Sequence, residues 1–156
     1  MNPDKDTLQA WFSALTDFKP NRFHPLVWML GEPQIGPGVY IGGFSEINAT
    51  GAKVMIGEGC DIASFVTINC ADSHQKCIGL SDVVERRDIC IEDHVFIGSH
   101  SVIKGGAHIG HHSVIAAGTI VDAGPIPPYS LVTGNPMVVK AGYFAQRLAR
   151  APGEAT

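Results

Sequence analysis

The sequence from residue 91 to residue 121 reads IEDHVF IGSHSV IKGGAH IGHHSV IAAGTI V, with an aliphatic residue at every sixth position. Two earlier stretches keep the same spacing. The aliphatic positions of all three are Ile35, Ile41 and Ile47, then Ile56, Ile62 and Ile68, then Ile91, Ile97, Ile103, Ile109, Ile115 and Val121. A period of six fits neither the 3.6-residue period of an α-helix nor the two-residue alternation of a simple strand. It is typical of short strands joined by tight turns, three of which close one triangular coil.

The residues between the aliphatic positions fit the same geometry. Coils stack about 4.8 Å apart, the usual spacing of paired strands, so each aliphatic side chain points inward onto its counterpart three hexads away. The second inward position, four residues after the aliphatic one, must be slim because the prism is narrow. Small or β-branched residues occupy it, as at Ser101, Ala107, Ser113 and Thr119. The sequence therefore predicts an all-β fold, a left-handed parallel β-helix of hexapeptide repeats, with glycines at the tight corners.

The 156 residues are expected to form a single domain with three segments. Residues 1–34 are predicted to form a short N-terminal helix and a connector, residues 35–124 the β-helix, and residues 125–156 a C-terminal turn and helix. The N-terminal helix is expected over residues 4–15 and the C-terminal helix over residues 141–149. The apolar face predicted for the N-terminal helix comprises Leu8, Trp11, Phe12 and Leu15.

The repeat is interrupted twice, and both interruptions are expected at corners of the prism. Nine residues rather than six separate two aliphatic positions around residues 48–53, which predicts a bulge of three extra residues there. Twenty-three positions separate Ile68 from Ile91, which predicts a long loop extruded over residues 69–88. Loops expelled from a rigid scaffold often carry function, and this one holds much of the polar chemistry of the chain.

Composition argues against several classes of function. The formal net charge is −4 and only 17% of the residues are charged, whereas nucleic-acid-binding domains usually carry a basic stripe. The longest apolar runs, such as residues 26–30, are too short to cross a bilayer, and the first residues lack the features of a secretory signal. We therefore expect a cytoplasmic protein. The four cysteines form no C-x-x-C pair and are expected to be reduced thiols.

The histidines fall into two groups. His94, His100 and His112 occupy the fourth place of their hexads and His111 the third, so all four are expected to point outward at turns. His94 and His112 lie one coil apart and are predicted to stack, which leaves open a metal site because neutral imidazole is a common ligand. His74 differs, because it opens the extruded loop close to carboxylates that can orient its ring. From the residues alone, His74 is equally well a general base or a capping residue of the loop.

Residues 35–140, about two thirds of the chain, resemble the hexapeptide-repeat acyltransferases, especially the sugar O- and N-acetyltransferases related to the maltose, galactoside and xenobiotic acetyltransferases. The resemblance rests on four segments in order. They are Ala71-Asp72-Ser73-His74, residues 91–99 (IEDHVFIGS), residues 113–118 (SVIAAG) and residues 126–136 (IPPYSLVTGNP).

The resemblance implies a function and roles for particular residues. It implies an acyltransferase with acetyl-CoA as the donor, no metal, and a histidine general base at His74. The acceptor, a sugar or nucleotide-sugar hydroxyl or amine, is expected to bind near the extruded loop and the asparagines. The expected acceptor-binding residues are Asn48, with Asn69 as the competing candidate, Asp72 and Glu85. The expected donor-binding residues are Phe96, Gly98, Ser99, Ala117, Gly118 and, at the nucleotide end, Lys140.

The family also implies a homotrimer with each active site between two prisms, and the low charge content fits buried subunit contacts. By analogy, the acceptor belongs to a bacterial surface polysaccharide pathway such as lipopolysaccharide biosynthesis. Two departures from the family bear on the donor site. Phe96 stands where the family often has tryptophan, and Asp122-Ala123-Gly124 replaces the usual basic residue after the last hexads.

Two other functions are compatible with the same repeat. A γ-type carbonic anhydrase shares the fold and binds zinc through three histidines, for which His94, His111 and His112 are the plausible set here. Alternatively, the chain is a non-catalytic trimeric scaffold with the loop as a binding surface. The His74 loop and the Gly134-Asn135-Pro136 ending favour acyl transfer over the carbonic anhydrase, and failure to bind any acyl-CoA would favour the scaffold.

Overall fold

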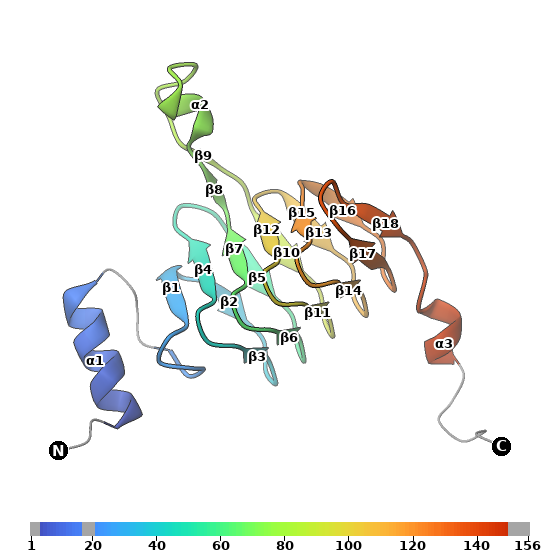
Figure 1. Cartoon of the computed structure of the whole chain (residues 1–156), viewed down its shortest axis with the longest axis horizontal. Coiled ribbons are helices and arrows are strands. Elements are labelled where there is room, and N and C mark those ends of the chain that lie inside the picture. Colours follow the sequence, from blue (N-terminus) through green and yellow to red (C-terminus); the bar gives the residue numbers. More distant parts are fainter. Residues whose placement is uncertain (1–3, 17–20, 150–156) are drawn as a thin grey trace.

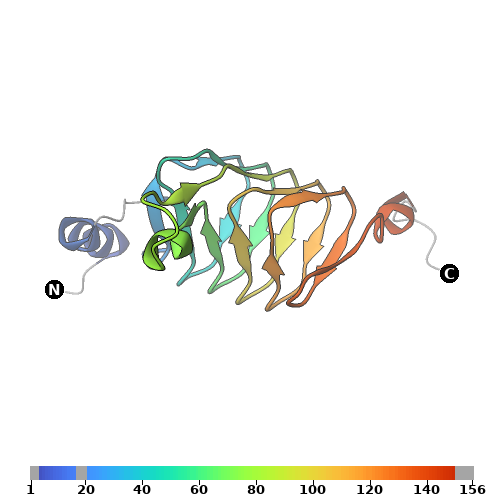
Figure 2. The ribbon, with the colours of Figure 1, turned by 90° about the horizontal axis from the view of Figure 1, so that it is seen from above.

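The computed structural model describes residues 4–16 and 21–149. The coils of the chain stack into a triangular prism (Figures 1 and 2). The predicted parallel β-helix is confirmed. Each of its three faces is a sheet of parallel strands drawn from successive coils. Helices lie at the two ends of the prism, and a ribbon with a short helix projects from one side of it (Figure 1). None of the helices in the described part of the chain is long and apolar enough to cross a membrane.

The three faces are defined by strand order. The first sheet contains, in spatial order, β1 (Trp28–Gly31), β4 (Glu46–Ala49), β7 (Thr67–Asn69), β12 (Val102–Lys104) and β15 (Ile120–Val121). The second sheet contains β2 (Gln34–Ile35), β5 (Val54–Ile56), β10 (Ile89–Ile91), β13 (Ala107–Ile109) and β16 (Gly124–Ile126). The third sheet contains β3 (Tyr40–Ile41), β6 (Asp61–Ile62), β11 (Phe96–Ile97), β14 (Val114–Ile115), β17 (Leu131–Thr133) and β18 (Val138–Lys140).

The core consists of the aliphatic positions of the hexads. The register places Ile91 against Ile56 on one side and Ile109 on the other, so the side chains form a continuous column along the inside of the face. These positions are at most 2% exposed from Ile41 to Val132. The slim second positions are also buried, and their hydroxyls are satisfied by backbone carbonyls, as when Ser101 Oγ donates to the Ala116 oxygen at 3.1 Å.

The corners of the prism share one backbone conformation. The fourth residue of most hexads is left-handed, and glycine fills it at Gly38, Gly59, Gly106 and Gly118. The same position holds a side chain with a φ between 55° and 63° at Phe44, Phe65, His94, His100, His112 and Tyr129. Such a backbone costs about 1–3 kcal/mol for a residue other than glycine, and ring stacking between coils offsets part of it.

The ring columns follow directly from this corner geometry. Along the corner between the third and first sheets, the ring centroids of Phe44 and Phe65 lie 5.0 Å apart, as do those of Phe65 and His100. Along the corner between the second and third sheets, the predicted stack of His94 and His112 is present, with ring centroids 5.0 Å apart. Each column is a consequence of placing an aromatic or imidazole ring at the same turn position of successive coils.

The β-helix extends beyond the expected residues 35–124 at both ends. At the start, β1 pairs in parallel with β4, and Met29 occupies the aliphatic position six residues before Ile35. At the end, β17 pairs in parallel with β14. One residue is missing between Val121 and Ile126, and this deletion hides the final hexads from a strict six-residue count. The antiparallel strand β18 then pairs with β17.

The terminal helices differ in detail from the sequence prediction. Helix α1 (Lys5–Leu15) begins after its N-cap, Asp4, whose carboxylate accepts the Thr7 amide hydrogen at 2.7 Å. Of the expected apolar face, the Phe12 ring stacks on Trp28, whereas Leu8, Trp11 and Leu15 are exposed. Gln9 is buried instead, because its side-chain amide donates to the Asn21 carbonyl at 2.8 Å. Helix α3 (Ala145–Ala149) begins later than the expected residue 141.

Candidate active site

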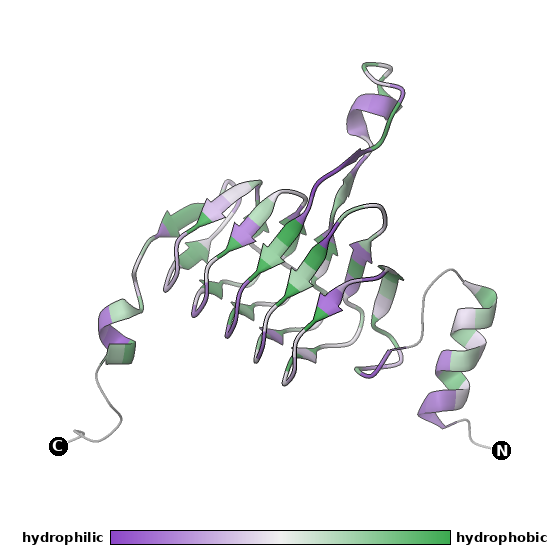
Figure 3. Ribbon diagram, turned by 180° about the vertical axis from the view of Figure 1, so that it is seen from behind, coloured by the Kyte–Doolittle hydropathy of each residue, from purple (hydrophilic) through white to green (hydrophobic). Residues whose placement is uncertain are grey.

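The extruded loop leaves the prism between the first and second sheets and projects well beyond it (Figures 1 and 3). Its base is a two-stranded antiparallel ribbon of β8 (Ala71–Asp72) and β9 (Glu85–Arg86), in which Asp72 lies opposite Glu85. Helix α2 (His74–Cys77) follows β8 directly. The ribbon therefore holds His74 near the outer surface of the first sheet rather than at the tip of the loop.

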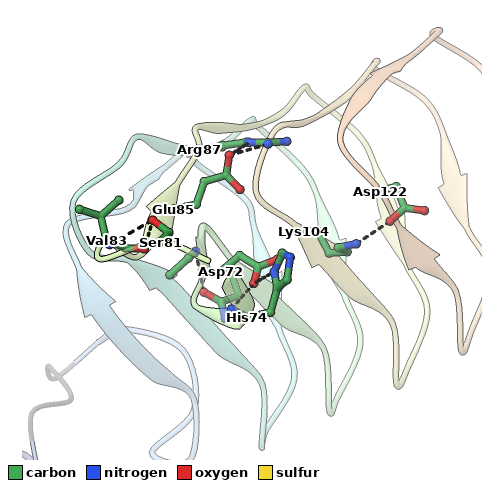
Figure 4. A network of polar contacts seen from close by, with 10 residues as sticks. Asp72, His74, Ser81, Val83, Glu85, Arg87, Lys104 and Asp122 are labelled. Carbon is green, nitrogen blue, oxygen red and sulfur yellow. Dashed lines mark hydrogen bonds and ion pairs between the residues drawn. The ribbon is translucent and has the colours of Figure 1, made fainter. Parts of the chain in front are cut away.

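His74 and Asp72 form the most directional side-chain pair of the loop (Figure 4). The His74 Nδ1 lies 2.6 Å from Asp72 Oδ1, and the same oxygen accepts the His74 backbone N–H at 3.0 Å. These two hydrogen bonds, the backbone one first, hold the pKa of the Asp72 carboxyl below its ordinary value of 3.8. An ionised Asp72 accepts a hydrogen bond from the Nδ1–H group, which leaves the lone pair of neutral His74 on Nε2.

A cleft of ≈ 420 Å³ lies between the loop and the outer face of the first sheet. Its floor comes from outward side chains of three successive coils, and its wall comes from the loop. The lining residues are Thr67, Asn69, Cys70, Ala71, Asp72, His74, Gln75, Glu85, Arg87, Val102, Lys104, Gly105, Asp122 and Ala123. A concave site with polar groups converging on a histidine is the usual form of a small-molecule site.

The charges of the cleft are arranged in pairs (Figure 4). Besides Asp72 and His74, Arg87 Nε donates to Glu85 Oε1 at 2.9 Å, and Lys104 Nζ lies 2.7 Å from Asp122 Oδ1. All of these side chains are solvent-accessible, and exposed ion pairs contribute only about 0–1 kcal/mol to stability. Each pair can therefore exchange a partner for a polar ligand at little cost.

The structure brings only some of the predicted acceptor residues together. His74, Asn69, Asp72 and Glu85 all line the cleft. Asn48 does not line it, although it pairs in register with Asn69, and its side-chain oxygen accepts the Thr50 amide hydrogen at 3.0 Å. Of the two competing asparagines, Asn69 is therefore the one beside His74.

The predicted donor residues lie elsewhere on the chain. Gly98 and Ser99 stand at the corner between the third and first sheets, as do Ala117 and Gly118 in the next coil, and none of them lines the cleft. This corner precedes the strands of the first sheet, whereas the His74 loop follows them, so the two groups occupy opposite edges of that sheet. A Cβ at Gly98 would lie 2.5 Å from the Ala117 nitrogen, so the coils are close there, while the space around Gly118 is open.

The other two donor candidates lie on the third sheet. Phe96 is on β11 and is 40% exposed, and Lys140 is at the end of β18 with its Nζ 6.0 Å from the Tyr143 ring. Neither residue lines the cleft. Within a single chain, the predicted acceptor and donor regions are therefore separate surfaces.

Two basic lining residues, Arg87 and Lys104, were not among the sequence candidates, and neither was the acidic Asp122. Lys104 follows the inward Ile103 and pairs in register with Asn69, so it projects from the coil next to the asparagine. The six-residue period predicts that Lys104 and Asn69 occupy equivalent outward positions. The extruded loop hides this, because it separates the two residues by thirty-five positions in the sequence. Arg87 lies at the return of the loop, where no repeat constrains its direction.

The histidine corner is a second cluster of titratable groups. His111 Nδ1 and His112 Nδ1 are 3.0 Å apart, and the rings of His111 and Tyr129 meet edge to face at 5.0 Å. In the part of the chain that the structure describes, no group of three or more histidine, cysteine or carboxylate side chains is placed to hold a metal ion. The set His94, His111 and His112, which a γ-type carbonic anhydrase would need, is not such a group: the His94 and His112 rings are tilted by 56°, and the His111 ring meets His112 edge to face.

The acid stability of the protein should depend on His112. Burial first, and then the neighbouring His94 and His111, lower the pKa of His112 from 6.5, while Asp93 opposes the shift. The unfolded chain therefore binds a proton at His112 more tightly than the folded protein does. The stability that comes from a neutral His112 is fully present above pH 6.5 and is lost as the pH falls. We expect the urea midpoint to drop less between about pH 7.5 and pH 5.5 in His112→Asn, which tolerates the left-handed backbone. Equal drops in both proteins contradict the assignment.

Comparison with known proteins identifies the type of repeat. The family model described as the hexapeptide repeat of succinyl-transferase matches residues 89–123. The chain carries the hexapeptide repeat. A search of curated protein sequences gives no match. Similar solved structures include the polysialic-acid-specific acetyltransferase NeuO, with 29% identity and a TM-score of 0.63 over 70% of this chain and 52% of that chain.

Two further acetyltransferase structures resemble the hexapeptide-repeat chain. Galactoside acetyltransferase in complex with coenzyme A is 27% identical, with a TM-score of 0.56 over 78% of this chain and 66% of that one. A hexapeptide-repeat acetyltransferase of Vibrio cholerae O1 biovar eltor, complexed with acetyl coenzyme A, is 26% identical, with a TM-score of 0.51 over 72% and 68%. The similarity to hexapeptide-repeat acetyltransferases predicted from the sequence is confirmed, although the chain spans only about half the length of NeuO.

Proposed function

We propose that this hexapeptide-repeat protein is an acetyl-CoA-dependent acetyltransferase that acetylates a hydroxyl or amine of a sugar or nucleotide sugar. The observation that carries the proposal is the His74–Asp72 pair, 2.6 Å between Nδ1 and Oδ1, placed in a polar cleft beside the β-helix. The three similar solved structures, of which two hold coenzyme A or acetyl coenzyme A, support the same donor.

The chemistry follows from the free Nε2 of neutral His74. This nitrogen removes the proton from the acceptor hydroxyl or amine as the acceptor atom attacks the thioester carbonyl. The tetrahedral oxyanion requires donors, for which the Ser99 hydroxyl or a nearby backbone N–H is the candidate. The C–S bond then breaks, and coenzyme A leaves as a thiolate, which is stable because thiols have a pKa of about 8.5. The protonated His74 returns its proton to the thiolate, so no covalent enzyme intermediate is needed.

The separation of the acceptor and donor residues supports a site built from two copies of the chain. Bringing Ser99 and Gly118 of one copy to the His74 cleft of another requires an interface, and a closed ring of copies satisfies every site. We assign the ring as a homotrimer. Light scattering of the purified protein coupled to gel filtration tests this assignment directly, and a monomer at working concentration contradicts it.

Two of the similar structures act on polysialic acid. NeuO is specific for polysialic acid, and OatWY, at 23% identity, is a polysialic acid O-acetyltransferase that shares the fold. By analogy we assign the chain to a bacterial surface polysaccharide pathway in the cytoplasm, with lipopolysaccharide biosynthesis as one instance. Neutral galactosides and amino sugars linked to a nucleotide are the other acceptors to be tested.

The proposal is tested first by calorimetric titration with acetyl-CoA, coenzyme A and desulfo-coenzyme A. We expect binding in roughly the micromolar range, the region of most enzyme–substrate affinities. Thiol release is then measured with sialic acid oligomers, galactosides and nucleotide-linked amino sugars as acceptors. Binding of acetyl-CoA with acceptor-dependent thiol release supports the enzyme. Absence of binding to acetyl-CoA, coenzyme A and desulfo-coenzyme A overturns it and leaves the scaffold function.

A further inference from the structure

The two interruptions of the repeat meet at the same corner of the prism. The bulge of residues 50–52 follows β4, and the extruded loop begins one coil later, after β7. Both ends of the loop form hydrogen bonds to the coil that carries the bulge. The Cys70 amide donates to the Asn48 carbonyl at 3.2 Å, and the Lys53 amide donates to Asp88 Oδ1 at 2.8 Å. The coil that carries the bulge is therefore hydrogen-bonded to both ends of the extruded loop and supports its base.

Arg86 makes the side-chain connection between them. It lies on β9, and its Nη1 donates to the carbonyl oxygen of Thr50 in a short hydrogen bond of 2.5 Å. Its aliphatic stem crosses Gly51, where a Cβ would lie 2.8 Å from Arg86 Cδ. Gly51 also has a φ of +74°, so glycine is needed there both for the turn and for the approach of the arginine.

The position of Arg86 in the ribbon links this contact to the candidate base. Arg86 pairs with Ala71, and the next pair along the ribbon is Asp72 with Glu85. Asp72 in turn holds His74 through both of its hydrogen bonds. We propose that Arg86, seated on the Gly51 bulge, is a positioning residue that fixes the extruded loop and thereby the Asp72–His74 pair for the acetyl transfer proposed above.

Other interactions of the loop are too weak to fix it. The strands β8 and β9 have two residues each, and a two-stranded hairpin is only marginally stable in water. Ile78, Leu80 and Val83 near the tip are 65%, 74% and 68% exposed, so apolar burial within the chain does not hold the loop down. The hydrogen bonds at its base orient it, and Arg86 contributes one of them through a long side chain that reaches the bulge.

The experiment measures loop order and turnover separately in Arg86→Ala. Amide hydrogen exchange of residues 71–86 should accelerate by about tenfold, while exchange in the coil strands is unchanged. Turnover should fall by about tenfold or more, because a base displaced by about an ångström loses much of its effect. The KM for acetyl-CoA should stay constant, since the donor candidates lie at another corner. The shape of the pH profile should also be retained, since Asp72 and His74 are both present.

Two further variants make the result specific. Lys76→Ala removes a cation from α2 of the same loop and should change neither exchange nor turnover. Gly51→Ala should loosen the loop in the same way, and its effect should be smaller in the Arg86→Ala background, where the crowded stem is absent.

The proposal is overturned if the Arg86→Ala loop exchanges like the wild type, or if the loop loosens while turnover is unchanged. It is also overturned if the KM for acetyl-CoA rises in parallel with the loss of turnover. If the wild type transfers no acetyl group to any acceptor, the function proposed above has failed. The exchange data then still decide whether Arg86 fixes the loop.

Discussion

Replacing His74 by alanine should lower the turnover number by roughly two to four orders of magnitude, the usual contribution of a positioned general base. The physical reason is the Nε2 lone pair, which Asp72 keeps available by accepting a hydrogen bond from Nδ1–H, with 2.6 Å between Nδ1 and Oδ1. Without the imidazole, the acceptor must lose its proton to water during attack on the thioester. The measurement is acceptor-dependent thiol release at saturating acetyl-CoA.

The same variant must keep its donor site if the assignment is right. The predicted donor residues lie at the corner of Ser99 and Gly118, so acetyl-CoA should bind His74→Ala with the affinity of the wild type in calorimetry. His108→Ala is the matched control, because His108 is also an exposed histidine paired with a carboxylate, Glu92, at 2.7 Å. Full activity of His74→Ala, or an equal loss in His108→Ala, rejects His74 as the base.

The β-helix could be predicted from the sequence because its period leaves no alternative. A six-residue repeat puts one aliphatic side chain inside the prism per strand, and every such residue from Ile41 to Val121 is at most 2% exposed. The stacking of His94 on His112 was predictable for the same reason, because equal hexad positions one coil apart lie above one another. In a regular structure with a fixed register, the spacing of two residues in the sequence is enough to predict whether they are in contact.

The ends of the fold were harder to predict because their pattern is degenerate. Methionine replaces the aliphatic residue at Met29, and a single deletion before Ile126 shifts the last hexads by one place. Helix α1 is held against the connector by polar contacts that its apolar spacing does not show, from Gln9 to the Asn21 carbonyl and from Lys5 to the Phe23 carbonyl. Neither feature has a repeat that would reveal it.

The sequence predicted only those residues of the candidate site that belong to a recognisable motif. His74 and Asp72 were found through the segment that opens the loop, whereas Lys104 and Arg87 reach the cleft through strand register and the return of the loop. The choice between Asn48 and Asn69 was beyond the sequence, because the two asparagines share one outward row and differ only in distance from the loop.

Replacing Asp72 by asparagine should lower turnover by about 10- to 100-fold while leaving the loop in place. Asp72 Oδ1 accepts both the His74 backbone N–H and the Nδ1 hydrogen bond, so an asparagine with its oxygen there keeps both contacts and the turn that starts α2. Asparagine lacks the negative charge, however, and no longer stabilises the imidazolium that forms when Nε2 takes the proton of the acceptor. The effect is smaller than for a buried pair because His74 and Asp72 are 61% and 43% exposed, and water can take over part of the role of the carboxylate.

Three comparisons separate this effect of the lost charge from a loss of structure. Asp82→Asn, an exposed carboxylate of the same loop outside the cleft, should be fully active. Asp72→Ala should lose both hydrogen bonds and therefore show faster amide exchange in α2, which Asp72→Asn should not. The pH profile decides the mechanism. Asp72 should stay ionised in the wild type across the assay range, because its hydrogen bonds to His74 hold the pKa of its carboxyl below 3.8, so a change in the profile of Asp72→Asn reports the loss of that charge. If Asp72→Asn is as active as the wild type with an unchanged pH profile, Asp72 has only a structural role and another group must orient the base.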